Sequence, residues 1–225
     1  HDIASASYEG QASVVEDDPP EDVEFQRWVA SKNEYTLRLV PVLPDRPMVA
    51  RTVAPLHVPF GHKAVVYLQL PLWVRVEMGP VKKPIILCEI PTVKNSNTWF
   101  GDPVSGELCY SLQTIASSEV PGTKVEPHRS MAMVSITNES DEELLKFERL
   151  CVRAPLLSLY QAEGSFWTND VRMLFKGGPH GDDVRYLRHK PEMAKSSRMV
   201  SEAREADKQG IIKSGIADIK HWVYG

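Results

Sequence analysis

The fold class is decided by the stretch Lys63-Ala-Val-Val-Tyr-Leu-Gln-Leu-Pro-Leu-Trp-Val-Arg-Val-Glu-Met78. It predicts two strands, Lys63–Leu70 and Leu72–Met78, separated by a proline that cannot donate a ladder hydrogen bond. In the second strand, apolar residues alternate with Trp73, Arg75 and Glu77, which is the period of a half-buried antiparallel strand. If these three side chains are exposed, they would form a protein-contact patch. If another strand or the C-terminal segment packs on them, they would have an ordinary structural role.

Strand-like segments continue along the chain, and the gaps between them are rich in the turn residues Gly, Pro, Asn and Asp. Many short strands at such spacing predict a mainly β fold, specifically an antiparallel β-sandwich that could consist of two similar β-units. Residues 41–59 carry five prolines, so strands there are expected to be short, broken or at a sheet edge. Residues 137–142 are expected to form a hairpin loop joining two long strands. The remaining predicted strands are Ile85–Ile90, Leu108–Thr114, Met131–Thr137, Leu144–Arg153, Leu156–Tyr160 and Ser165–Phe175.

The two ends of the chain differ from this β-rich region. Residues 1–22 are polar and acidic and are expected to be a loosely ordered segment. Residues 23–190 are predicted to form the sandwich domain, with halves 23–120 and 121–190 if the chain is duplicated. Within it, residues 23–39 are expected to form a hairpin, with a short helix as the alternative.

Residues 191–225 are predicted to be a helical C-terminal segment. Glu192–Lys208 is rich in Ala, Met, Glu, Lys and Arg, and Gly210 would end that helix. Residues 212–223 then place isoleucines at roughly helical spacing.

A Trp-x-x-Asp unit occurs twice, as Trp99-Phe-Gly-Asp102 and as Trp167-Thr-Asn-Asp170. A duplication and a chance similarity of two hairpins both explain this. Aromatic faces beside amides and carboxylates suit a sugar or another planar ligand, whereas Gly-Asp-Pro is also ordinary turn chemistry. The candidate ligand- or partner-binding residues are Asn97, Trp99, Phe100, Asp102, Trp167, Asn169 and Asp170.

Evidence for catalysis is sparse. If Asp102 and Asp170 met in space, they could act as an acid–base pair or bind a cation through oxygen, although turn formation is the more ordinary role for Asp. His180, Asp182 and Asp183 could hold a divalent metal, or form a solvated loop. No nucleophile motif and no phosphate-binding loop is present, which counts against nucleotide-dependent enzymes. No catalytic residue and no cofactor is therefore predicted.

Composition narrows the class of protein. The chain has 225 residues, enough for one large domain or two small ones, and 42% of them are hydrophobic. With a net charge of −4, the chain lacks the excess positive charge that is typical of nucleic-acid-binding proteins. No apolar run approaches the ~18 residues of a membrane span, and no signal-peptide pattern is present, so a cytoplasmic protein is expected.

The three cysteines lie in strand-like runs without a Cys-x-x-Cys pair. They are expected to be buried, reduced thiols of a cytosolic protein. A disulfide between Cys88 and Cys109 is an alternative that no pattern supports.

Several spaced motifs carry a family resemblance. Leu43-Pro-Asp-Arg-Pro47 is followed by Pro71-Leu-Trp-Val-Arg75, Glu89-Ile-Pro91, Asn97-Thr-Trp-Phe-Gly-Asp-Pro103 and Gly106-Glu-Leu-Cys-Tyr110. This series resembles a prokaryotic domain-of-unknown-function family, number 432, over about two thirds of the chain. The resemblance implies a soluble prokaryotic protein, and it implies no activity, cofactor or catalytic residue.

The sequence thus predicts a non-catalytic binding or regulatory module that acts on a protein partner or small ligand through the region Trp99–Asp102. This prediction rests on the fold-level analogy that β-sandwiches often serve as binding scaffolds. The alternative is a hydrolase or metal-assisted enzyme that uses Asp102, Asp170 and one of His128 and His180. The oligomeric state is left open.

Overall fold

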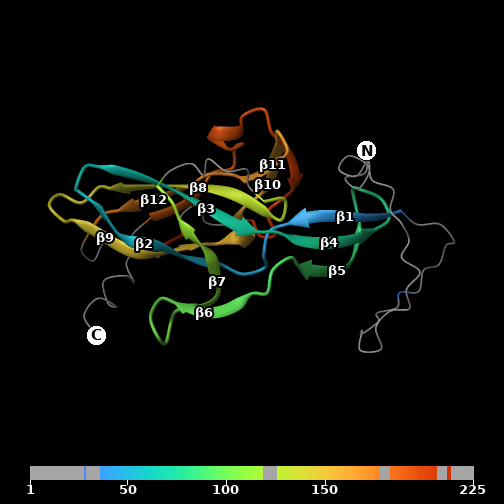
Figure 1. Cartoon of the computed structure of the whole chain (residues 1–225), viewed down its shortest axis with the longest axis horizontal. Helices are drawn as coiled ribbons and strands as arrows, with labels where there is room; N and C mark the ends of the chain where they lie inside the picture. Colours follow the sequence, from blue (N-terminus) through green and yellow to red (C-terminus); the bar gives the residue numbers. More distant parts are fainter. Residues whose placement is uncertain (1–27, 29–35, 119–125, 178–182, 207–211, 214–225) are drawn as a thin grey trace. The chain divides into compact units, whose positions relative to one another are not determined.

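The computed structural model describes residues 28, 36–118, 126–177, 183–206 and 212–213. The mainly β prediction is confirmed, since strands make up most of this part of the chain (Figure 1). The strands are β1 (Leu37–Val42), β2 (Met48–Val58), β3 (Lys63–Pro71), β4 (Trp73–Met78), β5 (Ile85–Pro91), β6 (Ser96–Phe100), β7 (Glu107–Ala116), β8 (Arg129–Asn138), β9 (Leu145–Val152), β10 (Leu159–Ala162), β11 (Ser165–Thr168), β12 (Val171–Phe175), β13 (Asp183–Tyr186), β14 (Arg198–Ser201) and β15 (Ile212–Lys213).

The chain divides into two compact units. Unit 1 comprises residues 1–41 and 74–90, and unit 2 comprises residues 42–73 and 91–225. Unit 1 is built on the three-stranded sheet β1-β4-β5. The strand predicted from Leu72 to Met78 is present as β4, but its burial does not alternate, since Trp73 and Glu77 are buried and the four other residues are half-buried. The proposed division into residues 23–120 and 121–190 stays a prediction.

A four-stranded sheet in unit 2 has the order β6-β7-β2-β9. Its strand β2 corrects the expectation for the proline-rich stretch, because it is eleven residues long and lies between two neighbours. The pairing of β2 with β9 is interrupted between Arg51 and Leu56, and Pro55 falls within this interruption. A central strand therefore tolerates the proline at a point where no ladder hydrogen bond is required.

The second sheet of unit 2 is eight-stranded and is organised around β8. Strand β3 pairs antiparallel with β8 along its whole length, as Figure 1 also shows, and β11 and β12 pair parallel with β8 on its other side. Every second side chain of β3 and of β8 points to the same side of the sheet, and these side chains form a fully buried core. Its members include Val66, Leu68, Leu70, Ala132, Val134 and Ile136.

Parallel pairs correct the prediction of an antiparallel fold. The β2–β7 pair is parallel, as are the pairs of β8 with β11 and β12, so both sheets of unit 2 are mixed. The predicted hairpin at residues 137–142 is also wrong, because the strands it joins, β8 and β9, belong to different sheets. Alternation identifies a strand but carries no information about its neighbours, which explains both errors. The sandwich arrangement stays a prediction.

The predicted C-terminal helix is wrong over the residues that the structure describes. Glu192–Ala194 forms a single 3₁₀ turn, and Arg198–Ser201 is the strand β14, which pairs with β10. The Glu205 N–H then donates to the Pro155 carbonyl. Pairing with β10 overrides the helix propensity of Ala, Met, Glu and Lys, which is a weak local preference. Residues 214–225 lie outside the described part of the chain, as do residues 1–22 and the turn expected at residues 31–33.

The search for membrane-spanning helices gave a negative result. Over the described residues, no helix has the length and apolar character that crossing a bilayer would require.

Candidate functional site

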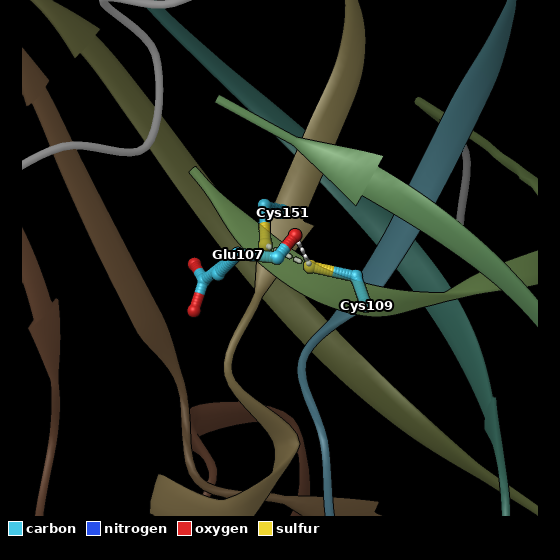
Figure 2. A group of neighbouring side chains, drawn as sticks. All are labelled: Glu107, Cys109 and Cys151. Carbon is cyan, nitrogen blue, oxygen red and sulfur yellow. Dashed lines mark hydrogen bonds between the residues drawn. The ribbon is translucent and has the colours of Figure 1, made fainter. Parts of the chain in front are cut away.

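Two cysteines far apart in the sequence meet in the four-stranded sheet. Cys109 lies on β7 and Cys151 lies on β9, with β2 between these strands. Cys151 stands opposite Val49 of β2, and both cysteines pack in one buried cluster with Val49 and Phe100. The sulfur atoms are 4.0 Å apart, and Figure 2 shows them turned toward each other.

A carboxylate completes the group. Side chains two residues apart share a face of a strand, so Glu107 of β7 lies on the same face as Cys109. One ligand atom from each of Glu107, Cys109 and Cys151 can be chosen so that all three lie within 4.8 Å of one another. Over the residues that the structure describes, this is the one set of three or more His, Cys, Asp or Glu side chains with such spacing.

Two arginines lie near the cysteines: Arg149 is on β9, and Arg153 directly follows the last residue of that strand. Arg153 donates to a Glu107 carboxylate oxygen at 2.6 Å. Arg149 donates to the Trp99 carbonyl at 3.0 Å, and its guanidinium lies 5.7 Å from the centre of the Phe100 ring. The buried Nε of Arg149 has no hydrogen-bond partner among the described residues. The positive charges of Arg153 and Arg149 both act to lower the pKa of Cys109 and so favour negative charge at its sulfur.

The thiols differ in acidity because of their contact. The pKa of Cys109 is lowered, chiefly by the hydrogen bond between the two thiols. The same hydrogen bond, together with burial, raises the pKa of Cys151 well above its usual range. Burial raises the pKa of Glu107, although the nearby Arg153 opposes this. The cluster therefore holds one thiolate more readily than two in the absence of a cation.

The distance between the sulfurs fits a shared metal ion better than a disulfide. Two thiolates bound tetrahedrally to zinc, with Zn–S bonds of ~2.3 Å, lie about 3.8 Å apart. A disulfide instead requires sulfurs ~2.05 Å apart and Cα atoms within about 6.8 Å. Because β2 separates β7 from β9, ordinary strand spacing places the two backbones about 9.5 Å apart. None of the three cysteines forms a disulfide in the structure; Cys109 and Cys151 are buried as predicted, whereas Cys88 is half-buried.

The first Trp-x-x-Asp copy is organised as a turn. Asp102 accepts hydrogen bonds from the Val104 and Ser105 N–H groups at 2.8 and 3.0 Å, and Trp99 Nε1 donates to the Asp102 carbonyl at 3.0 Å. Gly106 closes the turn, since a Cβ at that position would lie 2.6 Å from the Asp102 oxygen. Asn97 and Trp99 are exposed on the edge strand β6, and Phe100 is buried. Ligand binding by this copy stays a prediction.

The second copy lies in the other sheet of unit 2 and is largely buried. Trp167 is half-buried on β11, and Asn169 and Asp170 interrupt the predicted strand Ser165–Phe175. Asn169 accepts from the Ser158 N–H at 2.7 Å and donates to the Leu187 carbonyl at 2.6 Å. Asp170 accepts from the Glu192 N–H at 3.0 Å. Asp102 and Asp170 therefore serve separate turns, and the geometry gives the acid–base pair no support.

Asp170 leads to a pH prediction. Burial raises the pKa of this carboxyl, and its Oδ1 has no hydrogen-bond partner among the described residues. Because the pKa of this carboxyl is higher in the folded than in the unfolded chain, the folded chain binds the proton more tightly. The free energy of unfolding therefore falls as pH rises above the unfolded-state pKa of ~3.9. Asp170→Asn should therefore gain stability relative to the parent between pH 4 and pH 7, by about 1 kcal/mol.

Urea unfolding at both pH values checks this prediction, with Asp141→Asn, at an exposed carboxyl, as the matched control. A stability difference between D170N and the parent that does not change with pH would contradict it.

The metal set proposed from sequence falls largely outside the described residues. His180 and Asp182 lie in residues 178–182, while Asp183 is buried and pairs with Lys176 at 2.7 Å. His128 lies 3.3 Å from Glu126. The pairing of Cys109 with Cys151 was not predicted from the sequence. A usable signal was present, because Glu107-x-Cys109 and Arg149-x-Cys151-x-Arg153 each repeat polar or sulfur side chains at the strand period of two.

Comparison with known proteins gives one match. A family model described as a protein of unknown function (DUF432) matches residues 3–218. Neither the curated proteins nor the solved structures contain a match to this chain.

Proposed function

The chain belongs to this family of unknown function, and we propose that it is a metal-binding module that holds a thiophilic divalent cation of the zinc class. The ligands are the sulfurs of Cys109 and Cys151 and a carboxylate oxygen of Glu107. The observation that carries the proposal is the 4.0 Å approach of two sulfurs from non-adjacent strands, with a carboxylate beside them.

The donor set fits the chemistry of such an ion. Thiolates favour zinc and monovalent copper over magnesium and calcium, and zinc also accepts carboxylate oxygen. Three protein ligands leave a fourth position that water or a ligand atom can fill.

The surrounding charges support the same assignment. Two thiolates, one carboxylate and a divalent cation together carry one net negative charge, which the neighbouring Arg149 and Arg153 offset. Arg153 already donates a hydrogen bond to one Glu107 oxygen. At a metal site it would hold the carboxylate in its orientation without contacting the metal ion itself. Arg149 would supply its unpaired Nε–H to a metal-bound thiolate.

Metal titration tests this proposal. Protein reduced with a phosphine and stripped with chelator should bind one equivalent of Co²⁺, producing thiolate-to-cobalt absorption that Zn²⁺ then displaces. Cys109→Ser and Cys151→Ser should each lower the affinity at least 100-fold, since even outer partners of a metal site contribute 10–100-fold. Glu107→Gln should weaken binding but retain the absorption band.

Cys88→Ser is the matched control, because Cys88 lies in unit 1 and is half-buried. This variant should bind like the parent, and circular dichroism should show that every variant is folded. Equal binding by folded C109S protein would overturn the proposal. A parent protein that binds no metal, or that isolates with a Cys109–Cys151 disulfide, would overturn it as well.

A further inference from the structure

The sheet of unit 1 buries its charged face. Arg38 of β1 pairs with Glu77 of β4 at 3.3 Å, and Arg75 of β4 pairs with Glu89 of β5 at 2.6 Å. Arg38 and Glu77 are 7% and 8% exposed, and they must therefore be on a covered side of the sheet. The cross-strand pairs place all four charged side chains on the same face.

The opposite face is apolar and exposed. Successive side chains of a strand point to opposite faces, so the neighbours of the charged residues lie on the other side. Of these neighbours, Leu37 and Leu39 of β1 are 59% and 53% exposed, and Ile86 and Ile90 of β5 are 51% and 54% exposed. The face is completed by the half-buried side chains of β4 and β5, which are Val74, Val76, Met78 and Cys88.

An exposed apolar face of this kind gains stability when another segment packs on it. Burying a Leu or Ile side chain stabilises a protein, so a segment that covered these four half-exposed side chains would gain stability from their burial. Contiguous apolar patches on proteins commonly mark interaction sites. The segment that directly precedes β1 is the nearest part of the chain that could cover such a patch.

We propose that this face is a docking surface for the chain's own N-terminal segment, residues 16–29. Apart from Trp28, which is half-buried, residues 1–35 lie outside the described part of the chain. The sequence supplies four apolar side chains, Val23, Phe25, Trp28 and Val29, shortly before β1. These side chains would cover the apolar face.

The charges of the N-terminal segment and the length of the chain that links it to β1 both support its docking on this face. Six acidic residues fall within positions 16–24, and the exposed Lys82 and Lys83 lie in the turn between β4 and β5. The chain enters β1 at the same end of the sheet as this turn, because the Gly79 N–H donates to the Thr36 carbonyl at 3.1 Å. Residues 30–36 can span about 23 Å, whereas the first and third strands of a sheet are about 10 Å apart.

Cys88 provides the test, because it lies on the apolar face. In full-length protein carrying C109S and C151S, Cys88 is the remaining native cysteine. Phe25→Cys should then form an intramolecular disulfide with Cys88 under mild oxidation, at a rate independent of protein concentration. Ser7→Cys, which lies outside the proposed segment, should cross-link at least 10-fold more slowly. Peptide mapping by mass spectrometry identifies the linked residues.

A second variant tests the charge contribution. Lys82→Glu with Lys83→Glu should slow the cross-link several-fold at low salt, whereas Lys146→Glu, at an exposed position in unit 2, should leave it unchanged. Equal cross-linking by F25C and S7C would overturn the proposal. A concentration-dependent Cys88–Cys88 dimer would overturn it too, because the occupant would then be a second copy of the chain. Neither outcome depends on metal binding.

Discussion

Phe147→Ala is expected to lower the free energy of unfolding by about 3–5 kcal/mol, the usual range for truncating a buried aromatic side chain. Phe147 lies on β9 opposite Leu56 and is among the largest fully buried side chains of the described residues. Removing the ring leaves a cavity that the surrounding close-packed side chains can fill only in part. This loss is large compared with the total stability of an ordinary domain.

Urea unfolding followed by tryptophan fluorescence measures this effect. Lys146→Ala is the matched control, because Lys146 is the neighbouring residue on β9 and is exposed, and its loss should stay within about 0.5 kcal/mol. Phe147→Leu retains much of the buried volume and should fall between the two. A loss below 1.5 kcal/mol for Phe147→Ala would show that the core around β9 is not closely packed.

Asn138→Ala is expected to cost about 3 kcal/mol, because this fully buried amide connects the end of β2 with the loop that follows β8. Its Nδ2 donates to the Val58 and Glu143 carbonyls at 2.8 and 2.7 Å. Its Oδ1 accepts from the Ser140 N–H at 3.0 Å. Truncation removes all of these bonds and leaves buried backbone groups without a partner.

Asn138→Asp distinguishes the two sides of this amide. A carboxylate can still accept from the Ser140 N–H, but it cannot donate to two carbonyls. We therefore expect Asn138→Asp to be as destabilising as Asn138→Ala at pH 7, with faster hydrogen exchange in residues 138–145. Asn97→Ala, at an exposed position, should change stability by no more than about 0.5 kcal/mol. Wild-type stability of Asn138→Asp would contradict the assigned hydrogen bonds.

Much of the strand content could be read from local pattern. The strands predicted at Lys63–Leu70, Leu72–Met78 and Ile85–Ile90 agree with β3, β4 and β5 to within one residue at each end. The family resemblance is likewise confirmed. The helix predicted from Glu192 failed because it relied on propensity without alternation, and the pairing of β14 with β10 outweighs such a preference.

The candidate metal site could not be predicted from spacing. Cys109 and Cys151 are 42 residues apart, far from the short Cys-x-x-Cys spacing by which zinc sites are recognised. Only the placement of β2 between β7 and β9 brings them to one cluster with Val49. In contrast, the residues singled out by the repeated Trp-x-x-Asp pattern are divided between two sheets, with Asp102 and Asp170 in separate turns.

The sequence by itself determined which side chains share a face, since a period of two follows from strand geometry at each residue. It thereby grouped Arg75 with Glu77, and it separated both from Val74 and Val76. The tertiary structure alone decided that Glu77 of the charged face is buried and that Val74 and Val76 of the apolar face are half-buried. It also decided which strands are neighbours, and hence which cysteines meet. Burial and strand pairing depend on contacts between distant segments, and these contacts leave no local pattern in the sequence.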